Sequence, residues 1–182
     1  MNTYSGHDFI EIEALWRFFK EMLNKFELDT KGESHIQIVL RAHLYIENEL
    51  NKLLNNALKH PEIIVNYMRF VDKLRLVFAI GILPIDEMDV IKKINRLRNS
   101  FAHDLSFEIN DSIIEEITNS FSENQRKVFS TFYKSETDLT NKLRTALFTT
   151  WIMLFEANHI SFEMGNNLVK YEIGLLTANQ DE

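Results

Sequence analysis

The chain has no cysteine, and it has only two prolines and five glycines among 182 residues. The lack of cysteine excludes disulfides, thiolate metal sites and a cysteine nucleophile. Because proline and glycine interrupt helices, their scarcity favours long helices with short connections. Long apolar runs are also missing. The longest uncharged apolar stretch, residues 145–155, is far shorter than the ~20 residues that a membrane-spanning helix needs.

Basic residues are also fewer than acidic ones, which gives a formal net charge of −7. This balance weighs against non-specific duplex binding, which requires the neutralisation of many phosphates. It still allows a small basic site on an acidic body, or an acidic domain that acts on RNA delivered by a partner. Residues 1–10 contain no basic segment followed by an apolar run, so no signal peptide is expected. We therefore expect a cytoplasmic protein without membrane segments.

Apolar residues recur with helical spacing along most of the chain, and no segment strongly favours a strand. The sequence therefore predicts a single all-α domain over residues 1–182, an up-and-down bundle of five to six helices. Residues from 166 on are weakly patterned. The expected helices cover residues 8–27, 34–59, 62–80, 85–102, 111–134 and 136–160. The expected inner side of the second helix consists of Ile36, Val39, Leu40, Leu44, Leu50, Leu54 and Leu58.

The segment Arg98-Asn99-Ser100-Phe101-Ala102-His103 ends the fourth predicted helix. It combines a permanent cation, an amide and a group that titrates near neutral pH, the side chains needed to hold a phosphodiester and move protons. On a helix with ~100° per residue, Arg98 lies at the margin of the apolar side, about 140° from His103. The apolar side contains Val90, Ile94, Leu97 and Phe101, and the opposite, mostly basic stripe contains Lys92, Arg96, Asn99 and His103.

Arg98 and His103 can therefore meet only if the helix distorts or ends early, if the long arginine chain reaches back, or across a subunit interface. A plainer interpretation also exists. Arg98 then pairs with a buried glutamate, and His103 caps the carbonyl groups at the end of its helix. Glu47 is the carboxylate that we expect beside Arg98, with Arg75 as its less favoured partner.

Three segments together resemble the HEPN family of all-α domains, most closely proteins related to the mannitol operon repressor. They are Phe70-Val71-Asp72-Lys73-Leu74-Arg75-Leu76, Ile80-Gly81-Ile82-Leu83, and residues 91–103. The resemblance covers residues 35–115 and leaves 116–182 as additional helices and a tail. It implies a helical bundle that dimerises, with the arginine and histidine of both subunits in one interfacial cleft. By motif position the site residues are Arg98, Asn99 and His103, and Arg96 ranks second.

Many HEPN proteins are metal-independent ribonucleases, so the resemblance implies RNA cleavage by the adjacent 2′-hydroxyl without a cofactor. His103 is then the acid or base, Arg98 stabilises the phosphorane charge and Asn99 orients the phosphate or the imidazole. Lys92, Arg96 and Glu47 are possible supporting residues. A role in toxin–antitoxin systems or phage defence implies an antitoxin or another regulatory protein as partner. Repressor-like members lack nuclease activity, so a protein-binding regulatory module is the alternative, and a structural subunit with a vestigial motif is the third.

Two further groups have competing interpretations. His43 and Glu47 are four residues apart and face one side of a helix, but no second pair with ligand spacing accompanies them, so we expect no metal. A broad apolar cluster near the end of the sixth helix is interpreted as core, with a dimer or partner interface as the alternative. It consists of Phe148, Trp151, Ile152, Leu154 and Phe155.

Overall fold

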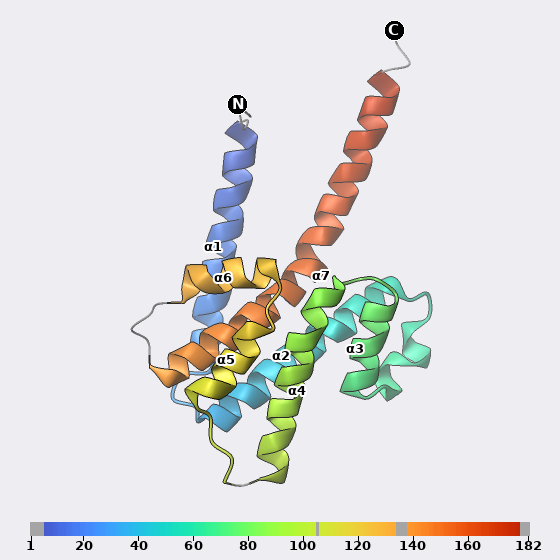
Figure 1. The fold of residues 1–182 in the computed structure, drawn as a ribbon. Helices are drawn as coiled ribbons and strands as arrows, with labels where there is room; N and C mark the ends of the chain where they lie inside the picture. Colours follow the sequence, from blue (N-terminus) through green and yellow to red (C-terminus); the bar gives the residue numbers. More distant parts are fainter. Residues whose placement is uncertain (1–5, 105, 134–137, 179–182) are drawn as a thin grey trace.

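The computed structural model describes residues 6–104, 106–133 and 138–178, and it describes side chains over 17–104, 106–133 and 138–158. The described chain is helical and contains no strand, which confirms the all-α class (Figure 1). The expected number of helices, five to six, is approximate. The α-helices are α1 (Gly6–Asp29), α2 (His35–Ala57), α3 (Phe70–Ala79), α4 (Met88–His103), α5 (Asp111–Asn119), α6 (Glu123–Phe132) and α7 (Leu139–Ala178).

The expected helix over residues 111–134 is wrong, because α5 ends at Asn119 and α6 begins at Glu123. Ser122 interrupts it with an extended backbone and caps α6 reciprocally with Gln125. The Ser122 amide donates to Gln125 Oε1 at 2.9 Å, and the Gln125 amide donates to Ser122 Oγ at 3.3 Å. Such a capping box satisfies two amides that a new helix would otherwise leave unpaired. The expected boundaries Lys134 and Glu136 lie outside the described residues.

The first half of the expected helix over residues 62–80 is also wrong. It consists of two short 3-10 turns, Pro61–Ile63 and Val65–Tyr67, and α3 begins only at Phe70. In the two turns only Val65 is buried, so no continuous apolar stripe holds this segment in an α-helix against the body. A third 3-10 turn, Ile85–Glu87, precedes α4, and α7 continues through the weakly patterned region to Ala178.

Helix α2 lies at the centre of the packing and contacts α7, α4 and α3. Ile46, Leu50 and Leu54 are fully buried on it. Phe148, Trp151, Ile152 and Leu154 of α7 are buried too, so the interpretation of this cluster as core is confirmed. Aromatic contacts link α7 to its neighbours, since the Trp151 ring lies 4.7 Å from Tyr45 and 5.8 Å from Phe26 between centroids.

The expected inner side of α2 is wrong at three positions. Ile36, Leu40 and Leu44 are exposed, and Leu44 retains 65% of its accessible surface. Apolar residues cover more than half of the helix circumference, so packing against α7 and α4 decides which of them are buried. We call Ile36, Leu40 and Leu44 the α2 stripe. The buried side consists of Ile38, Val39, Ala42, His43, Ile46, Glu49, Leu50, Leu53 and Leu54.

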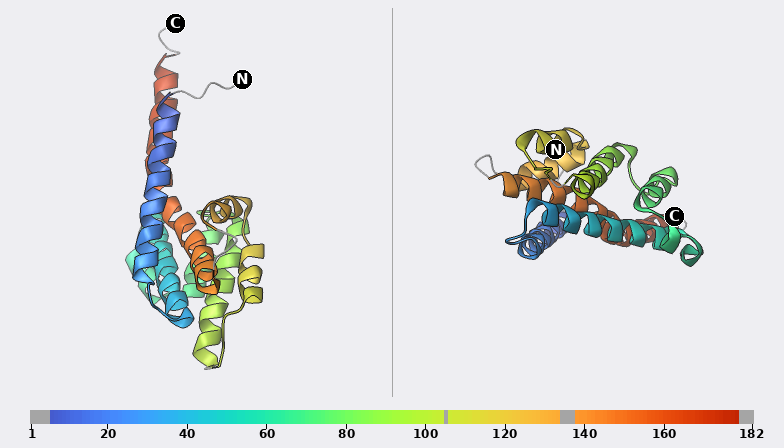
Figure 2. Two further views of the ribbon diagram at one scale, coloured as in Figure 1. Left: turned by 90° about the vertical axis from the view of Figure 1, so that its left-hand side faces the viewer. Right: turned by 90° about the horizontal axis from the view of Figure 1, so that it is seen from below.

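The first part of α1 and the last part of α7 project from the packed body in the same general direction, and they diverge from each other in Figure 1 (Figures 1 and 2). Within the described residues, none of the helices combines the length and the apolar character required to cross a membrane.

Glu87, the last residue of the 3-10 turn before α4, is only 4% exposed, and its carboxyl group has no hydrogen-bond or ion-pair partner among the described residues. Burial raises the pKa of its carboxyl to about 7, with smaller contributions from the charges of Asp86 and Glu156. Because the pKa is higher in the folded protein than in the unfolded chain, the folded state binds the proton more tightly. Glu87 therefore destabilises the fold increasingly as the pH rises from about 4.5 through 7.

Glu87→Gln removes this titration without much change in volume. We expect it to increase the free energy of unfolding by about 1–3 kcal/mol at pH 8 and by much less at pH 5. Urea unfolding at the two pH values measures the difference. Glu108→Gln, at an exposed position, is the matched control and should change neither value. An equal gain from Glu87→Gln at both pH values would contradict the prediction.

Candidate functional site

The segment from Arg98 to His103 forms the last turns of α4. Arg98 and Asn99 are half-buried, whereas His103, the final helical residue, is exposed. The amide of Asp104 donates to the Ser100 carbonyl at 2.9 Å, so the helix keeps its regular bonding to the end. A regular helix separates the Arg98 and His103 directions by about 140°. No contact joins Arg98 and His103 within the described residues, and the helix does not end before His103, as one of the alternatives required.

Arg98 has no carboxylate partner in the described part of the chain. Its Nη1 donates to Asn99 Oδ1 at 3.1 Å, and among the described residues this is the only hydrogen bond of its guanidinium. The expected pairing of Arg98 with Glu47 is wrong, because Glu47 Oε1 accepts from Lys73 Nζ at 2.8 Å. Arg75, the less favoured partner expected for Glu47, instead has its Nη1 atom 3.8 Å from Asp72 Oδ1. Arg98 therefore presents an uncompensated positive charge at a half-buried position.

Glu47 pairs with Lys73 because α3 packs on α2 and brings its nearly buried ammonium to the nearest carboxylate. Burying a lysine without a partner costs free energy, and the Glu47 carboxylate offsets this cost by pairing with the Lys73 ammonium. Sequence spacing contains no information on this choice, since the two residues are 26 positions apart.

The two remaining supporting residues lie elsewhere on α4. Arg96 is exposed and lines a depression of about 230 Å³ between α4 and α5, together with Lys93, Leu97, Ser100, Phe107, Ile113, Glu116 and Ile117. Lys92 Nζ lies 3.4 Å from Asp89 within the same helix. Arg98 does not line the depression, so Arg96 and Arg98 lie on different surfaces of the protein.

His43 and Asn95 also lie near Arg98, and the sequence did not indicate that either residue belongs to the candidate site. His43 is 7% exposed, its Nε2 lies 3.0 Å from Asn95 Oδ1, and its ring lies 4.2 Å from the Phe70 ring. Burial lowers the pKa of the imidazole, and the Arg98 charge lowers it further, against opposing effects of Asn95 and Glu47. The spacing of Asn95 four residues before Asn99 was the only available signal.

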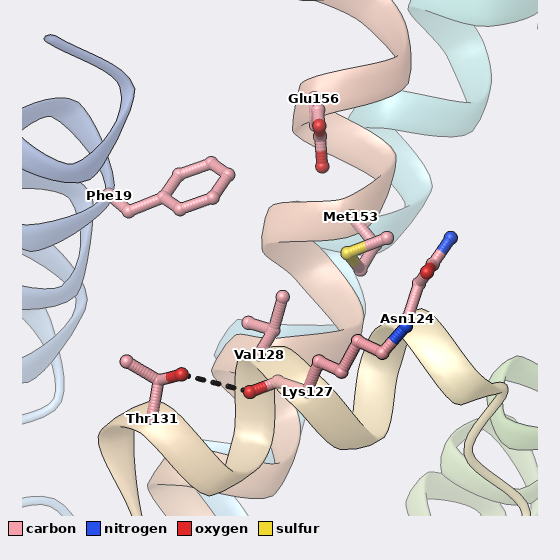
Figure 3. Close-up of a pocket in the computed structure, with 7 residues that line it drawn as sticks. All are labelled: Phe19, Asn124, Lys127, Val128, Thr131, Met153 and Glu156. Atoms are coloured by element: carbon pink, nitrogen blue, oxygen red, sulfur yellow. Dashed lines mark hydrogen bonds between the residues drawn. The ribbon is translucent and has the colours of Figure 1, made fainter. Parts of the chain in front are cut away.

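No metal cluster adjoins this group in the part of the chain that the structure describes. No set of three or more His, Asp or Glu side chains within the described ranges is arranged to hold a metal ion. A depression of about 350 Å³ lies between α1, α6 and α7, and no α4 residue lines it. Figure 3 shows Phe19 and Glu156 pointing into this depression from different helices.

No protein-family model, curated protein or solved structure matches the chain. The chemical capacity of the site therefore follows from its geometry. Half-buried guanidinium groups bind anions more strongly than exposed ones, because less water competes for the charge. Arg98 with Asn99 offers N–H donors to an oxyanion, and the exposed imidazole of His103 can exchange protons with a ligand that approaches the end of α4.

The pairing of Lys73 with Glu47 can be tested through stability. We expect Lys73→Met to lower the free energy of unfolding by about 1–3 kcal/mol, because it leaves Glu47 partly buried without a cation. The Lys73→Met/Glu47→Gln double variant should recover much of this loss. Urea unfolding measures both, and Arg75→Met, which removes an exposed cation from the same helix, is the control. A cost of Arg75→Met as large as that of Lys73→Met would contradict the pairing.

Proposed function

We propose that this protein is an endoribonuclease of the HEPN type, whose site is completed when two copies associate. The observation that carries the proposal is the state of Arg98, a half-buried guanidinium without a carboxylate partner in the described chain, next to Asn99. A module that used Arg98 only for structure would neutralise it with a buried glutamate. The nearby glutamate is instead paired with Lys73.

The reaction is an attack of a ribose 2′-oxygen on the adjacent phosphorus. The P–O2′ bond forms and the P–O5′ bond breaks, which leaves a 2′,3′-cyclic phosphate and a 5′-hydroxyl. A neutral His103 accepts the 2′-hydroxyl proton, and a protonated His103 from the other copy supplies the proton to the leaving 5′-oxygen. Arg98 stabilises the charge on the non-bridging oxygens, and Asn99 holds Arg98 or the phosphate in position.

A second copy of the chain is the partner that this site requires, since Arg98 and His103 point in different directions within one protomer. The α2 stripe supports the same partner. At 100° per residue, Leu40 lies within about 20° of Glu47 and 60° of His43, the residues through which α2 contacts α3 and α4. A copy seated on this stripe lies beside the face of α2 that carries the Arg98 neighbourhood.

Cleavage of a mixed single-stranded RNA in EDTA tests the activity. We expect wild-type protein to produce fragments with 2′,3′-cyclic phosphate ends. Arg98→Ala should reduce the rate by about 10²–10³, through loss of charge stabilisation, and His103→Ala by about 10²–10⁴, through loss of proton transfer. The rates and the end groups can be measured by gel electrophoresis and mass spectrometry.

Arg96→Ala is the matched control, because Arg96 is on the same helix but lines a different surface. It should retain most of the activity. Wild-type protein that does not cleave RNA would reject the nuclease, and a loss in Arg96→Ala without a loss in Arg98→Ala would move the site to the depression between α4 and α5.

Self-association through the α2 stripe is a separate prediction. We expect Leu44→Asp to convert a dimer to a monomer and to abolish cleavage, because it places a charge at the most exposed position of the apolar contact. Sedimentation velocity measures the mass. Leu28→Asp is the control, since Leu28 is 70% exposed on α1, and it should leave the dimer intact. A Leu44→Asp protein that stays dimeric would place the interface elsewhere.

The second candidate function is a non-catalytic module that regulates by binding another protein. One observation favours it, namely that the exposed side chains of Ile36, Leu40 and Leu44 form the kind of apolar surface that marks a protein partner. The same RNA assay separates the two functions, because a module of this kind would associate through the stripe and leave the RNA uncut.

A further inference from the structure

A partly buried hydrogen bond links α2 to α4 one turn before the Arg98 segment. His43 Nε2 lies 3.0 Å from Asn95 Oδ1, and Asn95 is four residues before Asn99 on the same helix. The Phe70 ring of α3 lies 4.2 Å from the imidazole between ring centroids. The imidazole of α2 thus contacts both α3 and α4, and a rotation or slide of α4 near Arg98 would break its hydrogen bond to Asn95.

We propose that His43 is a positioning residue for Arg98, which holds the turn of α4 that carries Arg98 and Asn99 and takes up a proton when a phosphodiester binds there. This inference rests on the proposed function for the identity of the anion. It does not require that the anion is cleaved.

The hydrogen bond itself survives protonation. Asn95 Oδ1 has no hydrogen to donate, so Nε2 is the donor in the neutral ring, and the neutral ring carries its lone pair on Nδ1. Protonation adds a hydrogen at Nδ1 and leaves the bond to Asn95 in place. A change of pH therefore alters the charge beside Arg98 and not the position of α4.

The coupling follows from the charges around the ring. Arg98 on α4 opposes protonation of His43, Glu47 on α2 favours it, and Lys73 on α3 partly neutralises Glu47. A phosphodiester bound to Arg98 cancels the opposing charge, so the pKa of His43 should rise on binding. Linkage then requires that the same anion binds more tightly when His43 is protonated.

The probe is a thymidine pentanucleotide, which lacks the 2′-hydroxyl and whose phosphodiesters stay ionised at every pH used. NMR titration of the histidine rings gives the pKa of His43 in the full chain with and without the probe. We expect the pKa of His43 to rise on binding, and affinity at low pH to exceed affinity at high pH by roughly three- to tenfold. His35, whose Nε2 lies 3.0 Å from Thr140 on α7, is the internal control.

Three variants separate positioning from general structure. In Arg98→Gln the pKa of His43 should already be raised and should no longer respond to the probe. His43→Gln retains a hydrogen-bond donor toward Asn95 without a titrating group, so it should bind the probe with the pH dependence reduced to that of the other histidines. His43→Leu removes the donor and should weaken binding at all pH values.

A pKa of His43 that does not respond to saturating probe would overturn the proposal, and so would probe binding that Arg98→Gln leaves unchanged. The RNA assay gives an independent result. A His43 response in a protein that does not cleave RNA keeps the coupled anion site and rejects the nuclease, whereas RNA cleavage without the response keeps the nuclease and rejects the role of His43.

Discussion

The burial of α2 is the constraint on which the rest of the structure depends. This helix contacts α7, α4 and α3, and its fully buried side chains form the centre of the core. A buried polar contact fixes its rotation, since Asn158 Nδ2 of α7 donates to Glu49 Oε2 at 2.8 Å and to the Glu49 carbonyl at 3.0 Å. Buried polar groups are usually hydrogen-bonded, so another rotation of α2 would be costly because it would break these two hydrogen bonds between α2 and α7.

This rotation determines the properties of the candidate site. It turns His43 toward α4, where the ring meets Asn95, and it turns Glu47 toward Lys73 of α3. Arg98 is consequently left beside α2 without a carboxylate. The same rotation leaves the α2 stripe in solvent. The uncompensated cation and the apolar surface that we propose for a second copy thus have one origin, because both follow from which side of α2 faces the core.

The local sequence patterns predicted the helices well, but they predicted poorly which side chains are buried against other helices. The periodicity located α1, α2 and α4 within a few residues, because a long amphipathic pattern is repeated over several turns. It joined α5 to α6, because the pattern continues across the cap that Ser122 and Gln125 form. It also placed Ile36, Leu40 and Leu44 on the inner side, since α2 has more apolar positions than its packing partners can cover.

The sequence by itself determined the helical class and the position of Arg98, Asn99 and His103 near the end of one helix, because hydrogen bonds between residues four apart are local. Only the tertiary structure decided that Glu47 pairs with Lys73, that His43 meets Asn95 across 52 residues and that no carboxylate in the described chain pairs with Arg98. These outcomes depend on the rotation and contacts of packed helices. They result from the summed burial and hydrogen bonding of the whole core, which no short segment contains.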